Sequence, residues 1–229
     1  KGAALTVANT NITALGQSSN TITAGAFKAG VNGNSIILGE GANAINLRSI
    51  SGGANGVEIS MAAAADEQKL NVSGSAVNVK YTGSAGADEV SFGGSVSKSQ
   101  FELGDGDNSF TALGAKSNVT DSRIEAVGTG ANTINILNFN SSAKGEAVIS
   151  LGEGDDSVSL GTLRGNSSVD LGAGENTFKA TSVDKAVVSG QGSGLYSVKT
   201  AKNMRFDLSG STGDIRLDIL TSLVNSTVD

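Results

Sequence analysis

The chain has 229 residues, a net charge of −6, 32 glycines and no Cys, His, Pro or Trp. Without cysteine and histidine, the sequence excludes a disulfide framework, a zinc site built on thiolates and a histidine acid/base group. The acidic balance and the lack of any basic run argue against nucleic acid as a partner, and no apolar stretch approaches the roughly 18 residues of a membrane helix.

A seven-position phrase, Gly-x-Gly-x-Asn/Asp-x-apolar, returns along the whole chain, roughly every 22 residues. With small residues replacing glycine in the weaker copies, the phrases begin at Gly16, Gly39, Ala62, Ser84, Gly104, Gly128, Gly152, Gly172, Gly190 and Ser209. Such repetition is typical of a solenoid, in which each repeat packs only on its neighbours. We therefore expect residues 1–229 to form a single elongated domain. Because the chain starts at Lys1 rather than Met, we also expect it to be a fragment of a larger protein.

Apolar residues alternate with polar ones on both sides of each phrase. The copy at Gly152 is preceded by Ile149 and Leu151 and is followed by Val158 and Leu160. A period of two predicts β-strands on either side of a tight glycine turn, and stacked coils bury the inward side chains that a single coil leaves exposed. The expected fold is therefore all-β, a right-handed parallel β-solenoid of about ten coils with roughly 22 residues per coil.

Two segments allow a second interpretation. Residues 60–69 (SMAAAADEQK) have high helix propensity, but the repeat register continues through them and favours a distorted coil over a helix. That register gives Asp66 the polar turn position and leaves Gln68 where an apolar residue is expected. At the other end, residues 215–229 are a candidate C-terminal cap, in which residues 219–224 (ILTSLV) fold over the last coil and cover its pairing edge.

The fifth position of the phrase is Asn or Asp in most copies. These residues are Asn20, Asn43, Asp66, Asp88, Asn108, Asn132, Asp156 and Asn176. A short amide tolerates the turn, hydrogen-bonds the turn's own backbone and can bond to the equivalent residue on the next coil. One interpretation of this column is therefore a structural ladder that runs from coil to coil and needs no ion.

The other interpretation of the same turns is calcium binding. The phrase resembles the RTX nonapeptide of bacterial type I secreted proteins, Gly-Gly-x-Gly-x-Asp-x-apolar-x, most closely at Gly152 (GEGDDSV) and Ser84 (SAGADEV). The resemblance implies a parallel β-roll-like coil whose turns bind Ca²⁺ through aspartate and backbone carbonyl oxygens. The chain departs from the RTX pattern, because only one turn per coil carries the phrase and most aspartates are replaced by asparagine, a weaker ligand for this ion.

The acidic residues concentrate in a few of the turns. Asp155 and Glu175 fall at equivalent positions on neighbouring coils, where a bound cation would relieve the repulsion between like charges. The candidate calcium ligands are Asp105, Asp107, Glu153, Asp155, Asp156 and Glu175. Calcium is the one cofactor that the sequence leaves open.

The spacing between phrases varies in the segment that returns to the next phrase, so insertions are expected on the edge opposite the glycine turns. Loops on one edge of a solenoid are frequent binding sites, because they do not disturb the stack. In the segment 138–146 (NFNSSAKGE) the candidate partner-binding residues are Asn138, Phe139, Asn140 and Lys144. The alternative is that the variation is tolerated drift.

These features predict a non-enzymatic structural or adhesive module of a bacterial extracellular or cell-surface protein, such as an adhesin, an autotransporter passenger or a surface-layer protein. The expected partners are a host or cell-surface protein, a glycan, or another copy of the chain. Three alternatives stay open: a calcium-dependent RTX-type module, a glycan-active β-helix enzyme, and an ice-binding solenoid. No residue is predicted to be catalytic, because the acidic residues lie on tight turns without aromatic or basic neighbours.

Overall fold

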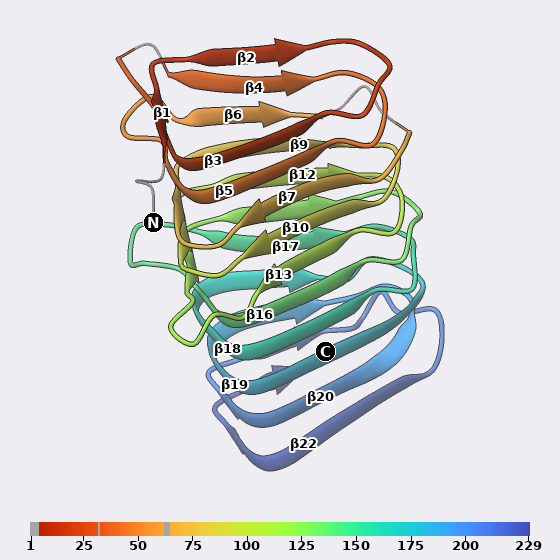
Figure 1. Cartoon of the computed structure of the whole chain (residues 1–229). Helices are drawn as coiled ribbons and strands as arrows, with labels where there is room; N and C mark the ends of the chain where they lie inside the picture. The colour runs from red at the N-terminus through yellow and green to blue at the C-terminus, as the bar shows by residue number, and fades with distance from the viewer. Residues whose placement is uncertain (1–4, 32, 62–64) are drawn as a thin grey trace.

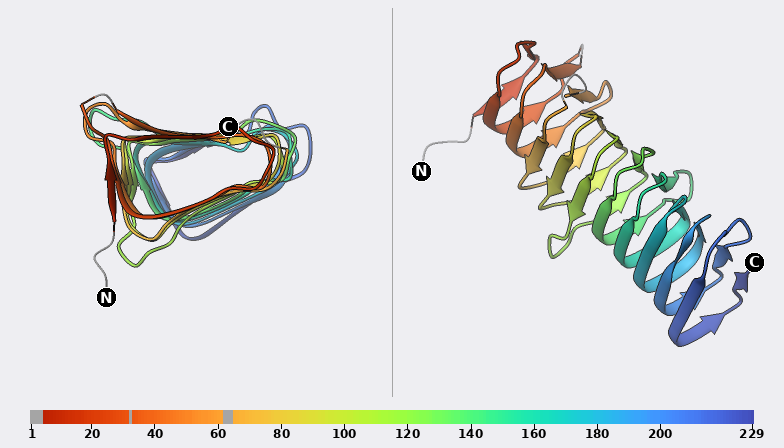
Figure 2. Two further views of the ribbon diagram at one scale, coloured as in Figure 1. Left: turned by 45° about the horizontal axis from the view of Figure 1, so that its top comes forward. Right: turned by 90° about the vertical axis from the view of Figure 1, so that its right-hand side faces the viewer.

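The computed structural model describes residues 5–31, 33–61 and 65–229. It is a parallel β-solenoid of about 10 turns with about 21 residues per turn, and the described residues contain strands but no helix. Figure 1 shows the coils stacked in chain order, and Figure 2 shows the same rod along and across its axis. Accordingly, none of the described segments is a helix of the length and apolarity needed to cross a membrane. The predicted all-β parallel solenoid is confirmed.

The strands of one coil pair with those of the coils before and after it, and every such pairing is parallel. The first coils contain β1 (Thr6–Ala8), β2 (Asn11–Ala14), β3 (Thr21–Lys28), β4 (Asn34–Leu38), β5 (Ala44–Ser51) and β6 (Val57–Ser60). The middle coils contain β7 (Gln68–Val72), β8 (Ala76–Val77), β9 (Val79–Ser84), β10 (Asp88–Phe92), β11 (Val96–Ser97), β12 (Gln100–Gly104), β13 (Ser109–Ala112), β14 (Val119–Thr120) and β15 (Arg123–Ala126). The last coils contain β16 (Thr133–Asn140), β17 (Ala147–Leu151), β18 (Ser157–Asp170), β19 (Glu175–Ser189), β20 (Ser193–Lys202), β21 (Arg205–Asp207), β22 (Ile215–Val224) and β23 (Thr227–Val228).

Each coil has three sides, which are visible in the view along the axis (Figure 2, left). In the middle of the rod these sides are β10, β11 and β12, and we call the corresponding surfaces the first, second and third face. The glycine turn connects the third face to the first face of the next coil. A corner residue with positive φ, Lys98 (φ 51°) in this coil, separates the second face from the third. In the later coils single strands run through the corners, and β18 spans all three faces.

The inward side chains form columns along the rod axis. On the first face Phe110 pairs with Ile134, Ile134 with Val158, and Val158 with Phe178, and all four side chains are fully buried. Across the interior, the rings of Phe101 and Phe110 pack edge to face with 5.0 Å between their centroids. Because each coil covers the apolar side chains of its neighbours, burial of these columns drives the stacking.

The described residues of the segment 60–69 continue the coil. Strand β6 ends at Ser60, the chain bends at residues 65 and 66, and β7 begins at Gln68. Strand β7 lies between β5 and β10, which places Leu70 between Ile45 and Val90. The coil interpretation is therefore confirmed over the described residues, while the predicted turn positions 62–64 lie outside them.

The C-terminal segment extends the stack instead of folding over it. Strand β22 pairs with β20, and β23 pairs with β21, so residues 215–229 form one further coil and not the predicted cap. The apolar alternation of β22 matches that of β20, with Leu217 opposite Tyr196, so pairing in register satisfies both the backbone and the inward side chains. Leu220 and Leu223 remain exposed on this coil.

Candidate functional site

Buried amide side chains form a ladder at the glycine turns. Asn132 shows the pattern: its Nδ2 donates to the carbonyl oxygen of Gly130 (2.9 Å) and to Asp156 Oδ1 (2.9 Å) on the next coil. Asp156 Oδ1 also accepts from the backbone N–H of Asn132 (2.8 Å). The same bond from Nδ2 to the next coil is made by Asn20, Asn43 and Asn108. These bonds are those of the structural ladder that the sequence predicts.

Gln68, and not Asp66, occupies the third place in the ladder. Its Oε1 accepts from the backbone N–H (3.3 Å) and Nδ2 (2.9 Å) of Asn43, and its Nε2 donates to the carbonyl oxygen of Gly41 (3.0 Å). Gln68 is fully buried, whereas Asp66 is exposed in the turn. The assignment of Asp66 is corrected because the glutamine side chain is long enough to make both ladder bonds. The sequence contains a signal for this assignment: Leu70 follows Gln68 by two residues, and an apolar residue follows each of the other ladder positions by the same distance.

Two places in the ladder hold carboxylates. Asp88 Oδ1 accepts from the hydroxyl of Tyr81 (3.0 Å), and Asp88 Oδ2 accepts from the backbone N–H of Ser84 (2.8 Å). Asp156 Oδ1 is bonded to Asn132, but the buried Asp156 Oδ2 has no hydrogen-bond partner. Burial raises the pKa of both Asp88 and Asp156 from 3.8 to about 6, although the hydrogen bonds they accept act in the opposite direction. Burial therefore makes the charged form of both side chains less favourable in the folded chain than in the unfolded chain.

This pKa shift predicts a fold that is more stable in mild acid. A carboxyl whose pKa is higher in the folded chain stabilises the fold below its unfolded pKa near 3.8, and this contribution is lost as the pH rises through about 6. We expect the melting temperature to fall between pH 4.5 and pH 7.5, and Asp156→Asn to reduce this dependence and raise the melting temperature at pH 7.5 by about 2 to 4 °C. Thermal melts of both chains, followed by circular dichroism at pH 4.5 and pH 7.5, measure these differences in melting temperature.

Asp107→Asn is the matched control, because Asp107 lies in the same kind of turn but is exposed. It should leave the melting temperature at pH 7.5 close to that of the wild-type chain. If Asp156→Asn melts at or below the wild-type temperature at pH 7.5, the buried carboxylate does not destabilise the ladder.

The exposed acidic residues of the turns bond to the backbone of the next coil. Asp105 Oδ1 accepts from the N–H groups of Thr129 (3.0 Å) and Gly106 (2.9 Å), which lower the pKa of Asp105. Asp107 Oδ1 accepts from Ala131 N–H (2.8 Å), and Asp155 Oδ1 accepts from Glu175 N–H (2.7 Å). Across the part of the chain that the structure describes, no three acidic side chains are grouped so that they could hold a metal ion. The six candidate ligands therefore do not form one centre, because three of these carboxylates hold turn backbones together.

We accordingly expect calcium to leave the fold unchanged. A ligand that binds only the folded chain must raise its melting temperature, and Asp105, Asp107 and Asp155 already use one oxygen each for backbone N–H groups. The measurement is a thermal melt with millimolar CaCl₂, with MgCl₂ at equal concentration as the control for ionic strength. A calcium-specific rise of several degrees would instead establish the RTX-type alternative.

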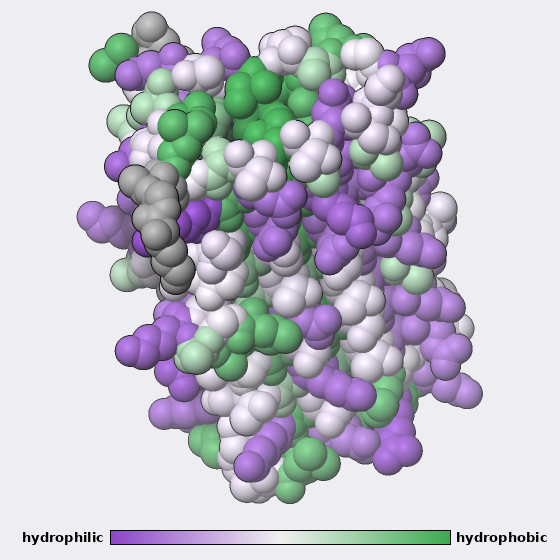
Figure 3. All heavy atoms as spheres, in the orientation of Figure 1, coloured by the Kyte–Doolittle hydropathy of each residue, from purple (hydrophilic) through white to green (hydrophobic). Residues whose placement is uncertain are grey.

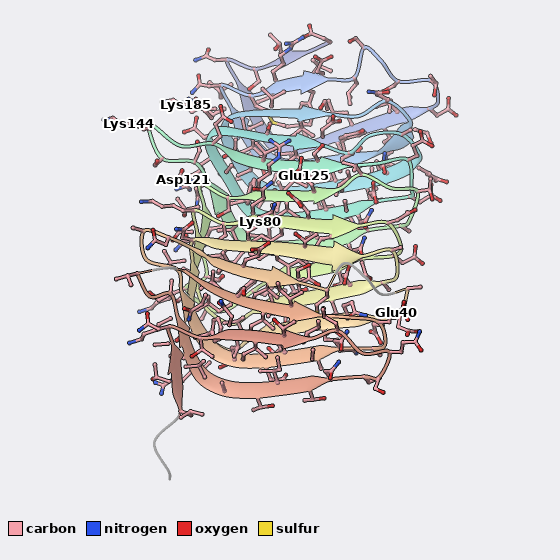
Figure 4. The ribbon with its side chains drawn as sticks, turned by 90° about the horizontal axis from the view of Figure 1, so that it is seen from above. Glu40, Lys80, Asp121, Glu125, Lys144 and Lys185 are labelled. Carbon is pink, nitrogen blue, oxygen red and sulfur yellow. The ribbon has the colours of Figure 1, made fainter. Side chains whose placement is uncertain are left out.

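The segment 138–146 divides into a buried strand and an exposed loop. Phe139 is fully buried and pairs with Val119 and Leu163 in the core, which removes it from the candidate partner-binding residues. Asn138 and Asn140 belong to the same strand, and Thr162 Oγ1 donates to Asn138 Oδ1 (2.8 Å). Only Lys144 lies on the exposed loop, at the edge of the rod (Figure 4). The alternation of inward and outward side chains in β16 continues from the first face onto the second face, which the sequence analysis expected to be a variable segment. This alternation turns Phe139 toward the core.

An elongated groove runs along the corner between the second and third faces. It has a volume of about 880 Å³ and is lined by corner residues and by residues at the start of β2, β4, β6, β9, β12, β15 and β17. Asn78, Lys98 and Asp121 lie at the corner with positive φ, and Lys80 and Arg123 lie on the third-face strands. Figure 4 shows Asp121 at the edge of the rod and Lys80 on the adjoining face. Successive coils thus contribute to one polar surface.

A column of serines, which the sequence analysis missed, runs beneath this groove. The backbone N–H of Val79 donates to Ser99 Oγ (3.1 Å), and the backbone N–H of Ser99 donates to Ser122 Oγ (3.1 Å) on the next coil. Each hydroxyl donates in turn to a carbonyl oxygen two residues earlier, at 2.9 Å. The sequence signal was a serine directly after the corner residue of two successive coils, in Lys98-Ser99 and Asp121-Ser122. The groove therefore has a hydrogen-bonded and ordered base.

The groove is the candidate functional site because it brings equivalent polar positions from seven successive coils into one hollow. Two of its three cations are held against the third face: Arg123 Nη2 lies 2.6 Å from Glu125 Oε1, and Lys80 Nζ lies 3.7 Å from Glu102 Oε1. The chemistry that it offers is a row of hydrogen-bond donors and acceptors with fixed charges. Comparison of the chain with protein-family models, curated proteins and solved structures finds no match.

Proposed function

We propose that the chain is a non-enzymatic structural and adhesive repeat module of a bacterial extracellular or cell-surface protein. The observation that carries the proposal is the groove, whose lining comes from strand after strand of the same face. A binding surface built in this way grows with the number of coils, which is how solenoids make extended surfaces for their partners. The acidic, cysteine-free and glycine-rich composition supports an extracellular location.

The ladders support the structural half of the proposal. Neighbouring coils are joined by backbone pairing and by the inward apolar columns, and the amide ladder adds side-chain bonds between several of them. Stability in such an array is a sum of interfaces between neighbouring coils, so the rod keeps its shape along its length. These properties suit a spacer that holds a binding surface away from a cell, as in an adhesin, an autotransporter passenger or a surface-layer protein.

Deleting one coil tests this proposal. Removal of residues 109–132 joins Asn108 to Thr133, which is the register partner of Ser109, and leaves the remaining coils in register. We expect the variant to keep its β circular dichroism and cooperative melting, and the rod to shorten by about 4.8 Å in small-angle X-ray scattering. A module built from equivalent coils tolerates the loss of one coil. A protein that depends on a single active centre in this part of the rod does not.

The control is a deletion of residues 109–120, which removes part of a coil and places strand against turn. This variant should misfold or aggregate. In parallel, the wild-type chain is incubated with polysaccharides, and released reducing ends or unsaturated products are measured. Product release would overturn the non-enzymatic assignment in favour of the glycan-active alternative, and loss of folding in the whole-coil deletion would overturn the modular one.

A further inference from the structure

The geometry of the groove points to an extended, uncharged glycan as its ligand, and this inference rests on the adhesive function proposed above. The groove crosses β2, β4, β6, β9, β12, β15 and β17, which at about 4.8 Å per coil makes it about 30 Å long. A ligand that uses this length must be a linear polymer, because a small molecule would contact only one or two coils. The rise per coil is also close to the length of one hexose unit, so successive sugars would meet equivalent positions.

The charges of the lining cancel along the groove. Its positive side chains are Lys80, Lys98 and Arg123, and its negative side chains are Glu58, Asp121 and Glu146. A polyanion or polycation would therefore meet as much repulsion as attraction, and the net charge of −6 adds further repulsion for a polyanion. An uncharged polymer meets no such repulsion, and its hydroxyl groups can bond to carboxylates and ammonium groups alike. Hydrogen bonds to charged groups are the stronger ones in such recognition.

Amides complete the hydrogen-bonding surface. Asn11, Asn55, Asn78 and Gln100 line the groove. Each amide makes a hydrogen bond within the protein and keeps a further donor or acceptor for a ligand. Among the described lining residues there is no aromatic side chain, Val57 and Val79 are buried beneath the surface, and Val148 is half-buried at one end of the groove. The groove therefore has no apolar pocket of the kind that anchors a helix or a peptide side chain.

The backbone of the groove is also closed to an added strand. Strand β12 is hydrogen-bonded to β9 on one side and β15 on the other, and β6 lies in the same way between β4 and β9. An extended polypeptide binds most readily by pairing with a free strand edge. Between the two ends of the groove the strands offer none, and among the described strands of the groove only β2, at its first end, is paired on one side alone. A hydroxyl-rich chain needs only side-chain contacts, which the groove supplies along its whole length.

The loop 141–146 ends the groove on the side of the later coils. Asp121 Oδ1 accepts from the backbone N–H of Ser142 (2.6 Å), which ties the loop to the corner, and Glu146 belongs to the lining. A second hollow beyond the loop is lined by Lys144 and Glu146. The bound segment is therefore limited to the seven strands of the groove, whose six intervals of about 4.8 Å correspond to a chain of about six hexose units.

Isothermal titration calorimetry on the full chain tests this inference. The probes are three neutral linear hexasaccharides (cellohexaose, chitohexaose and mannohexaose), the matching disaccharides, and hexagalacturonate as the anionic comparison. We expect saturable binding of at least one neutral hexasaccharide, about tenfold or more tighter than its disaccharide, because each occupied coil adds hydrogen bonds. The double variant Lys80→Ala, Gln100→Ala should weaken that binding by about tenfold. Both side chains are on the surface, so the variant should keep its melting temperature within about 2 °C.

The control is Asn71→Ala, Ser91→Ala, which removes a similar pair of polar side chains from the first face. It should bind as the wild-type chain does. The inference is overturned if no neutral hexasaccharide binds at millimolar concentration, if hexagalacturonate binds more tightly, or if the control weakens binding equally. In these cases the coil-deletion result still decides the adhesive-module proposal by itself, whereas release of shorter sugars from a bound probe would overturn both proposals.

Discussion

Val158→Asp is expected to unfold the coils around β18. Val158 is fully buried and packs between Ile134 and Phe178 of the neighbouring coils, where an aspartate has no partner for its charge. An uncompensated buried charge costs about 3 to 5 kcal/mol, which is a large fraction of the stability of a typical domain. Because coils contact only their neighbours, the loss should spread from this coil, and Ile134→Asp should behave in the same way.

Circular dichroism melts and amide hydrogen exchange measure this effect, with loss of protection centred on β16, β18 and β19. The matched control is Ser159→Asp, one residue further along the same strand, where the side chain is exposed and lies opposite Lys179. It should change the stability by less than about 0.5 kcal/mol. The defect of Val158→Asp should lessen at pH 4, since protonation removes the buried charge. An unchanged melt would show that Val158 does not face the core.

Gly172→Ala is expected to disrupt the glycine turn between β18 and β19. Gly172 has φ 63°, and a Cβ there would come within 1.9 Å of the carbonyl oxygen of Gly152 on the preceding coil. The left-handed conformation costs an alanine about 1 to 2 kcal/mol, and forcing apart two packed backbones costs about 1 to 3 kcal/mol more. The lost stability is measured by urea denaturation, with the midpoint and the m-value fitted together.

Gly16→Ala is the control for the glycine turn. Gly16 opens the first copy of the same phrase, but a Cβ added to it meets no atom within 4 Å. The substitution should leave the urea midpoint close to that of the wild type. Equal losses for the two variants would mean that the loss at Gly172 does not come from the close approach of neighbouring coils.

The repeat pattern made the fold predictable. Alternating apolar residues such as Val158 and Leu160 identify inward positions, and the glycine phrase identifies the turn where coils approach most closely. Both are local signals with a fixed period, so they can be recognised without knowledge of the neighbours. The amide ladder followed for the same reason, except at Gln68, where a longer side chain fills the place of an asparagine.

The candidate site was less predictable. The sequence directed attention to the edge opposite the glycine turns, and the groove lies there, but its lining is built by Lys80, Lys98 and Arg123 on strands and corners and not by Phe139. These charged residues come from different coils, and nothing in their spacing shows that they share one hollow. Their proximity depends on the left-handed corner conformation and on the register of stacking.

By itself, the sequence determined the all-β solenoid, its turn positions and most of its inward columns, because each of these depends on a short periodic pattern. Only the tertiary structure decided that acidic side chains of the turns, such as Asp105 and Asp155, bond to backbone N–H groups instead of meeting at one ion. It also decided that residues 215–229 form a further coil and that a groove runs along the corner. These features depend on which groups of successive coils come within hydrogen-bonding distance, and that follows from stacking in three dimensions.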